Sequence, residues 1–268
     1  MRSSRIIVTG ASGALGAAAV RALAGQGHSV VMACRNLEKA AAVRDRILAE
    51  VPGARLDIRE LDLASPASVH AFAGSLDGGP VAALFNNAGV ISRGYALTPD
   101  GLEQTFAVNY FGPVLLTRLL LPRLEPDASI VNMVSLTCRF VQVTEKSLFP
   151  EEKDFSQLGT YARSKLAMIY FSQELARRNP SLRINLADPG IVNSNMISMG
   201  RWFDPLADLL FRPFCKSPAR GVRPALAALA SEERGQYFVG KRVLELPDRF
   251  DDPELALRLW EVTDRILF

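Results

Sequence analysis

The chain has 268 residues, of which 49% are hydrophobic and 22% charged, and its formal net charge is +3. This length and composition are typical of one globular domain with a large apolar core. The basic residues form no run, which argues against a nucleic-acid-binding protein. Three cysteines lie far apart without C-x-x-C spacing and predict neither a disulfide framework nor a zinc site; they are Cys34, Cys138 and Cys215.

The N-terminus leads directly into a short apolar run that ends at Gly10, without the pattern of a signal peptide. No apolar stretch of the sequence reaches the ~20 residues that a membrane span needs. From these two features we expect a cytoplasmic protein.

Apolar runs alternate with helical patterns along the chain, and Asn36, Ser65-Pro66, Thr98-Pro99 and Ser217-Pro218 mark helix starts. This alternation predicts an α/β fold: a Rossmann-type doubly wound, mainly parallel seven-stranded sheet with helices on both faces, in a single domain over residues 1–268. The expected strands are Arg5–Val8, Ser29–Ala33, Arg55–Glu60, Val81–Phe85, Ser129–Val134, Arg183–Ala187 and Val239–Leu246. The expected helices are Ala14–Ala24, Leu37–Glu50, Pro66–Ser75, Pro99–Pro122, Tyr161–Asn179, Pro218–Ala230 and Pro253–Leu267.

The first expected strand ends in Thr9-Gly-Ala-Ser-Gly-Ala-Leu-Gly16, directly before an alanine-rich helix. Glycines there permit a tight turn and let backbone N–H groups approach a pyrophosphate at the positive end of the helix. The turn therefore indicates a dinucleotide site, with a ligand-free tight turn as the alternative.

The second expected strand ends at Arg35-Asn36. At this place an acidic residue would bind a ribose 2′-hydroxyl and select NAD, whereas an arginine offers a bidentate partner to a 2′-phosphate. Arg35 therefore favours NADP(H) over NAD(H), which stays the alternative cofactor.

Tyr161 and Lys165 stand four residues apart at the start of an expected helix, so both project from one face of it. A cation beside a phenol favours phenolate, and such a tyrosine exchanges a proton with an alcohol or carbonyl near neutral pH. A Tyr-x-x-x-Lys pair alone is usually a surface feature, so its meaning depends on the other motifs.

Together these motifs resemble those of the short-chain dehydrogenase/reductase family along nearly the whole chain. Asp62-Leu63, Asn86-Asn-Ala-Gly89 and Pro189-Gly190 follow expected strands in the family's order. The glycine turn departs from the family's usual Thr-Gly-x-x-x-Gly-x-Gly, because Gly13 comes one position early and Ala14 replaces the middle glycine. The 26-residue interval between Ser135 and Tyr161 is similar to that of the retinol-dehydrogenase and protochlorophyllide-reductase group.

The resemblance implies an NADP(H)-dependent oxidoreductase that transfers hydride between the nicotinamide and a carbonyl or alcohol. Tyr161 would be its general acid/base, and Lys165 would lower the tyrosine pKa and bind the nicotinamide ribose. Ser135 would donate to the substrate oxygen, and Asn109 would hold a water behind the lysine.

The resemblance also implies contacts to each part of the cofactor. Asp62 would bind the adenine, Asn86 and Gly89 would shape the floor under the adenosine ribose, and Ser194 would hold the nicotinamide amide. The full set of expected cofactor-binding residues is Gly10, Ser12, Gly13, Leu15, Gly16, Arg35, Asn36, Asp62, Leu63, Asn87, Ala88, Gly89, Tyr161, Lys165, Pro189, Gly190, Val192 and Ser194.

Two segments, Thr137–Gln157 and Asn195–Lys216, fit the strand–helix alternation poorly. Long loops at the carboxyl ends of strands commonly bind ligands, and we expect a substrate lid near residues 195–216. Apolar residues at helical spacing in the lid, with others in the first segment, predict a lipophilic substrate. These residues are Trp202, Phe203 and Leu206 in the lid and Phe140, Val141 and Val143 in the facing wall. The alternative is that the lid helix packs on the sheet, a partner chain or a membrane surface.

Other readings of the same sequence stay open. A non-catalytic dinucleotide-binding regulator or scaffold would use the same fold, and the glycine spacing also fits a nucleotide-sugar epimerase or dehydratase. Nucleotide-sugar epimerases and dehydratases usually have a larger C-terminal substrate domain, and too few residues follow Pro189 for one. We expect a small-molecule partner and no metal. The apolar helices within Phe106–Leu121 and Tyr161–Leu175 either pair in a homo-oligomer or pack on their own sheet.

Overall fold

The structure is a computed structural model that describes residues 5–77, 79–192, 216–240 and 242–268. Its sheet has the strand order β3-β2-β1-β4-β5-β6-β7-β8 and is parallel except at the last pair. The chain order reverses between β1 and β4, and doubly wound sheets bind ligands outside the strand ends at such a point. The strands are β1 Arg5–Thr9, β2 Ser29–Cys34, β3 Arg55–Glu60, β4 Val81–Asn86, β5 Leu124–Met133, β6 Arg183–Asp188, β7 Tyr237–Val239 and β8 Arg242–Leu244.

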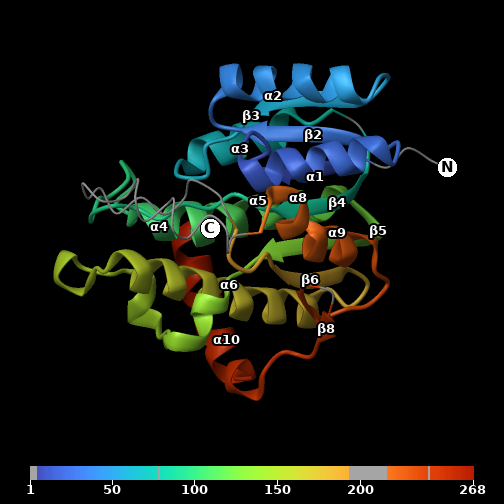
Figure 1. Cartoon of the computed structure of the whole chain (residues 1–268). Helices are drawn as coiled ribbons and strands as arrows, with labels where there is room; N and C mark the ends of the chain where they lie inside the picture. Colours follow the sequence, from blue (N-terminus) through green and yellow to red (C-terminus); the bar gives the residue numbers. More distant parts are fainter. Residues whose placement is uncertain (1–4, 78, 193–215, 241) are drawn as a thin grey trace.

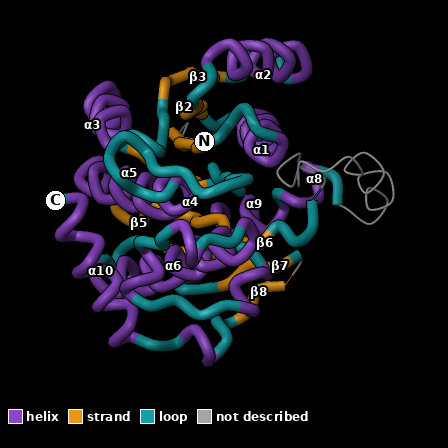
Figure 2. The backbone as a smooth tube through the Cα atoms, turned by 90° about the vertical axis from the view of Figure 1, so that its left-hand side faces the viewer, coloured by secondary structure: helices purple, strands orange, loops and turns teal. Residues whose placement is uncertain are grey.

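Helices cover both faces of the sheet, because neighbouring strand residues such as Ile7 and Val8 point to opposite sides and belong to two separate apolar clusters. Helices α1, α2 and α9 pack on the Val8 face, and α3, α5, α6 and α10 on the Ile7 face, while α8 contacts α1. Figure 2 shows the strands running between these two groups. The helices are α1 Ala14–Gly25, α2 Leu37–Glu50, α3 Pro66–Ser75, α4 Gln104–Phe106, α5 Gly112–Leu120, α6 Gln157–Arg178, α8 Pro218–Gly221, α9 Arg223–Ala230 and α10 Pro253–Leu267.

The expected helix Pro99–Pro122 is wrong at its start. Thr98 and Pro99 begin a turn, closed by a hydrogen bond from the Gly101 N–H to the Thr98 carbonyl, with Gly101 at a φ of +79°. The helix instead begins after Glu103, whose carboxylate accepts from the Phe106 N–H at 2.9 Å. A proline after a threonine fits a turn as well as a helix start, and the glycine two residues later decides between them.

The expected strand Val239–Leu246 is also wrong, because it is a hairpin of β7 and β8. Gly240 has a φ of +63°, and Val239 pairs with Arg242 across the turn. Glycine enters this left-handed region at little cost because it has no Cβ atom, which suits the position to a chain reversal. The sheet of the described residues consequently has eight strands and not the expected seven.

Helix α10 covers the apolar side of α6 (Figure 1). The rings of Phe171 and Trp260 stack with centroids 5.4 Å apart, and the hydroxyls of Tyr110 and Thr263 lie 2.8 Å apart. This part of the apolar helix Tyr161–Leu175 therefore packs against α10 of the same chain. Within the described ranges, the structure has no helix whose length and apolarity would allow it to cross a bilayer.

Candidate active site

The glycine turn between β1 and α1 leaves the first turn of the helix open to a ligand. Gly10 has a φ of +63°, and a side chain there would meet the Cα atom of Ala88 at 2.9 Å. Gly16 packs against Ala11 so closely that a Cβ atom would lie 2.8 Å from its Cα atom. Gly13 is the N-cap in an extended conformation and Ala14 is simply the first, exposed helical residue. The unusual glycine spacing therefore keeps a regular helix N-terminus, which favours an anion such as a pyrophosphate.

Asn87 joins the loop after β4 to the glycine turn. Its side-chain amide donates to the Thr9 carbonyl at 2.8 Å, while the Ala88 N–H donates to the Thr9 hydroxyl at 3.0 Å. Asn86 points the other way and is buried, with its amide donating to Thr117 at 3.0 Å and to Asn132 at 2.8 Å. The Asn86 side chain therefore links β4 to β5 and α5, and the expectation that Asn86 shapes the floor under the adenosine ribose stays a prediction.

The ends of β2 and β3 bring the expected adenosine-binding residues to one edge, because the Leu61 N–H donates to the Cys34 carbonyl at 3.0 Å. Arg35 and Asn36 are exposed there, and the Asn36 side chain caps α2 by accepting from the Lys39 N–H at 2.7 Å. Asp62 accepts from the Ala64 N–H at 3.0 Å, so part of its carboxylate stabilises its own loop.

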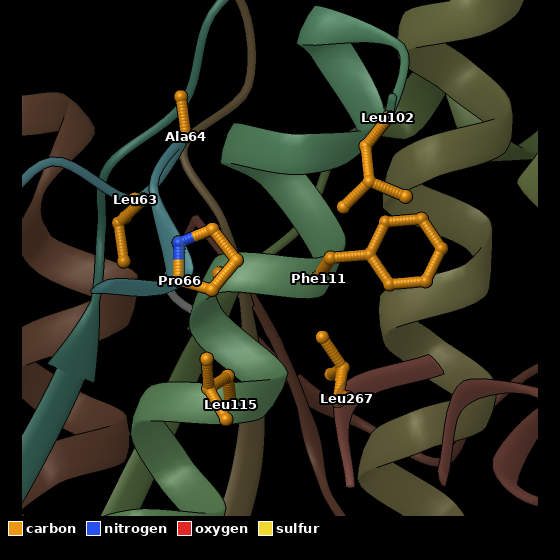
Figure 3. Close-up of a pocket in the computed structure, with 8 residues that line it drawn as sticks. Leu63, Ala64, Pro66, Leu102, Phe111, Leu115 and Leu267 are labelled. Atoms are coloured by element: carbon orange, nitrogen blue, oxygen red, sulfur yellow. The ribbon is translucent and has the colours of Figure 1, made fainter. Parts of the chain in front are cut away.

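Leu63 is buried against α5 and is one of the residues that line a cavity of about 10 Å³ (Figure 3). This volume is close to that of a single water site and far below that of a dinucleotide or substrate pocket. The cavity is therefore a packing gap beneath the expected adenine loop. Its lining residues are Leu63, Ala64, Pro66, Leu102, Phe111, Gly112, Leu115 and Leu267.

Gly89, Asn109 and Lys165 meet at the carboxyl edge of β4. A Cβ atom on Gly89 would lie 3.3 Å from Lys165 Nζ and 3.4 Å from Asn109 Oδ1. Lys165 is only 3% exposed, and its ammonium donates to the Met133 carbonyl at 2.9 Å. Burial lowers the pKa of Lys165 from 10.5 to about 8.

Asn109 lies in a π-helical turn, Ala107–Phe111, a distortion that is frequent at functional sites. Its side-chain oxygen accepts from the Val90 N–H at 2.8 Å, and its amide donates to the Val90 carbonyl at 2.9 Å and to Ser164 at 3.0 Å. These bonds tie the β4 loop to α6 through the Asn109 side chain. The expected role of Asn109 in holding a water behind the lysine stays a prediction.

Ser135 follows β5 and Tyr161 lies on α6, and the Ser135 hydroxyl lies close enough to Tyr161 to lower its pKa. Burial has the larger effect and raises the pKa of Tyr161 to about 12, and the Asp188 carboxylate acts in the same direction as burial. This direction is opposite to the expected one. The reason is that desolvation of the phenolate outweighs the opposing groups, and the Lys165 ammonium is hydrogen-bonded to a backbone carbonyl.

Four residues of this edge were not predicted from the sequence. Thr137 donates to the Ser135 hydroxyl at 3.0 Å, and Asp188 accepts from the Tyr237 hydroxyl at 2.8 Å. Lys216 donates to the Pro189 carbonyl at 3.2 Å. The one available signal was Asp188, an acidic residue directly before the Pro189-Gly190 motif at the end of an expected strand.

The expected substrate wall is only partly present among the described residues. Phe140 is 82% exposed, Val141 is partly buried against the core, and Val143 is a buried core residue, which removes it from the wall. Gly221 of α8 lies against both Leu15 and Val192, so these two expected cofactor residues come together. Other expected residues lie outside the described ranges, namely Ser194, Trp202, Phe203 and Leu206.

A model of the short-chain dehydrogenase family matches residues 4–201. The chain belongs to this family. Among similar proteins, retinol dehydrogenase 14 of Mus musculus is 33% identical over 98% of this chain and 86% of its own length. The human retinol dehydrogenase 13 is 31% identical over 98% of this chain and 84% of its own length. The WW domain-containing oxidoreductase of Danio rerio is 35% identical over 98% of this chain and 68% of its own length.

Solved structures of other proteins share the fold. An uncharacterised protein from Mycobacterium paratuberculosis superposes with a TM-score of 0.81 at 28% identity, covering 98% of this chain and 93% of that one. A dehydrogenase from Sphingobium yanoikuyae in complex with NADPH superposes with a TM-score of 0.70 at 22% identity, covering 96% and 94%. One from Burkholderia phymatum in complex with NAD has a TM-score of 0.68 at 22% identity, covering 89% of each chain. Members of this fold thus bind either nicotinamide dinucleotide.

Proposed function

We propose that this short-chain dehydrogenase is an NADP(H)-dependent oxidoreductase acting on a lipophilic carbonyl/alcohol pair, with Tyr161 as the general acid/base. The observation that carries the proposal is the meeting of Ser135, Tyr161 and Lys165 at the edge where the Gly89 loop ends. The open N-terminus of α1 and the exposed Arg35 fit the pyrophosphate and the 2′-phosphate of such a dinucleotide.

When bound, the nicotinamide supplies or accepts a hydride, and the chain has to move the proton. A phenol with a pKa of about 12 holds its proton at neutral pH, which suits Tyr161 to protonate the oxygen of a carbonyl substrate. Ser135 accepts from Thr137, so its own proton is directed to another oxygen, either that of Tyr161 or that of a substrate. Lys165 brings a donor beside the Gly89 loop, where a ribose hydroxyl would accept from it.

A lipophilic substrate is supported by two features. The relatives named retinol dehydrogenases act, by their names, on an apolar alcohol. Apolar side chains are also exposed on the segments that follow β5 and β6: Leu136 is 41%, Phe140 82% and Ile191 70% exposed. An apolar substrate would reduce the contact of such side chains with water.

The test is to incubate the purified protein with NADPH and a panel running from small polar aldehydes to long polyene, terpenoid and steroid ketones and aldehydes. We expect net NADPH oxidation, with kcat/KM rising with the apolar area of the substrate. Tyr161→Phe should bind NADPH with unchanged affinity and lose at least about tenfold in rate, ~1.4 kcal/mol of barrier. A parent that binds the dinucleotide without turning over any carbonyl would favour the regulator or scaffold, and a flat series would reject the lipophilic preference.

The location in the cytoplasm stays a prediction from the sequence. Fractionation of cells that express the chain would test it, since recovery with the membranes would contradict the prediction.

A further inference from the structure

A carboxylate lies buried at the end of β6, outside the residues that are proposed above to transfer the proton. Asp188 is 1% exposed and both of its oxygens accept hydrogen bonds, one from the Gly190 N–H at 2.7 Å and the other from the Tyr237 hydroxyl at 2.8 Å. Burying a charged carboxylate is costly unless donors surround it. An asparagine has the same shape and could accept the hydrogen bond from the Gly190 N–H without burying a charge. The hydrogen bond to Gly190 therefore does not by itself explain why position 188 carries a carboxylate.

The strand register places this carboxylate beside the catalytic edge. Met133 pairs with Ala187, and the Val134 N–H donates to the Ala187 carbonyl at 2.9 Å, so Asp188 lies next to the strand end that carries Ser135. The Asp188 charge is also among the causes that raise the pKa of Tyr161, which places the two groups within electrostatic reach.

Asp188 also begins the Pro189-Gly190 turn. Gly190 has a φ of +70°, its N–H is held by Asp188, and the preceding carbonyl is held by Lys216. The Lys216 N–H further donates to the Ile191 carbonyl at 2.9 Å. The turn is therefore fixed by β6, by β7 through Tyr237, and by the segment before α8.

We propose that Asp188, held by Tyr237, is a positioning residue that anchors the Pro189-Gly190 turn and whose negative charge favours the oxidised over the reduced dinucleotide. The proposal rests on the proposed dinucleotide site, in which the nicotinamide lies beside Tyr161. An oxidised nicotinamide ring carries a positive charge and a reduced one is neutral. A fixed negative charge at this buried edge attracts the oxidised ring and has little effect on the reduced ring.

The experiment measures the dissociation constants of NADP⁺ and NADPH by titration calorimetry, without substrate, for the parent, Asp188→Asn and Tyr237→Phe. Asp188→Asn removes the charge and keeps the shape. Tyr237→Phe is the matched control, because it removes one donor and keeps the charge. Thermal melts of the free proteins show whether each variant folds.

For Asp188→Asn we expect the ratio of the NADP⁺ constant to the NADPH constant to rise about tenfold relative to the parent. For Tyr237→Phe we expect both constants to rise together, with their ratio changing by less than about twofold. An unchanged ratio in Asp188→Asn would overturn the role of the charge, and unchanged constants in both variants would overturn the anchoring of the turn.

Asp188→Ser provides the same comparison if the asparagine variant does not fold. If neither neutral variant folds, the fold itself requires the carboxylate and the proposal is wrong. A parent that binds neither dinucleotide would reject the proposed function itself. A parent that binds both without turnover would reject the enzyme and leave the inference about Asp188 standing.

Discussion

The Lys165 ammonium on α6 donates a hydrogen bond to the backbone carbonyl of Met133 on β5, with 2.9 Å between Nζ and the oxygen. The lysine is almost fully buried, and its partner is a neutral group. Burial without a counter-charge lowers the pKa of a lysine, here to about 8. The lysine expected to serve catalysis thus lowers the stability of the fold that holds it.

We predict that Lys165→Met stabilises the fold at pH 7 while it abolishes turnover. Below pH 8 the folded chain carries a buried charge, and between about 8 and 10.5 the unfolded chain keeps a proton that the folded chain has lost. The free energy of unfolding of the parent therefore increases as the pH rises from about 8 to 10.5. The free energy of unfolding of the variant should be higher than that of the parent by on the order of 1–3 kcal/mol at pH 7. Above about pH 10.5 the two proteins should be equally stable.

Urea unfolding of both proteins at pH 7, 9 and 10.5 measures this difference. Lys39→Met, at an exposed position of α2, is the control and should change little. A Lys165→Met variant that is less stable than the parent at pH 7 would show that the ammonium contributes more as a donor than its burial costs.

Arg35 should decide the cofactor preference, because it is the exposed cation directly after β2. We predict that the parent binds NADPH more tightly than NADH and that Arg35→Asp weakens NADPH about a hundredfold, ~2.8 kcal/mol, with NADH nearly unchanged. Fluorescence titration of both dinucleotides checks this. Arg46→Asp makes the same charge change at an exposed position of α2 and should preserve the order. Equal affinities of the parent for the two dinucleotides would remove Arg35 as the selector.

Thr137 should act through Ser135. The Thr137 hydroxyl and N–H both donate to Ser135 Oγ, at 3.0 and 3.3 Å. Thr137→Val keeps the shape and removes the hydroxyl donor, so we expect kcat to fall about tenfold, ~1.4 kcal/mol, with the dinucleotide affinity unchanged. Thr137→Ser should restore the rate. Steady-state kinetics on the best substrate decide it, and equal rates for the valine and serine variants would show that the hydroxyl is not needed.

Gly112 allows the loop after β3 to pack on α5. A Cβ atom at this position would lie 2.8 Å from the Leu63 Cβ atom and still closer to the Leu63 carbonyl oxygen. We predict that Gly112→Ala lowers the free energy of unfolding by about 1–3 kcal/mol, because the clash exceeds the gain in helix propensity of ~1 kcal/mol. Gly74→Ala in α3 meets no atom within 4 Å and should be neutral or stabilising. Thermal melts compare them, and equal melting temperatures would contradict the close packing.

The sequence by itself determined the layers and the edge at which the site lies. Apolar period and turn residues locate β1 to β6 within a residue or two of their observed bounds, except β5, which begins earlier at Leu124. Parallel strands bring their carboxyl ends together, so the loops that follow the strands were expected to lie at one edge of the sheet. The family resemblance then named Ser135, Tyr161 and Lys165 as one set, and their proximity is what the fold produces.

The tertiary structure alone decided how each of these groups is solvated and hydrogen-bonded. The direction of the Tyr161 pKa depends on desolvation by the folded chain, and no spacing within one helix contains that information. The same holds for Asn86, which turns into the core, and for Asp188, whose donors come from Gly190 and from Tyr237, 49 residues away. A local pattern reports which face a side chain occupies, whereas pKa values and hydrogen-bond partners depend on distant segments that only the folded chain brings together.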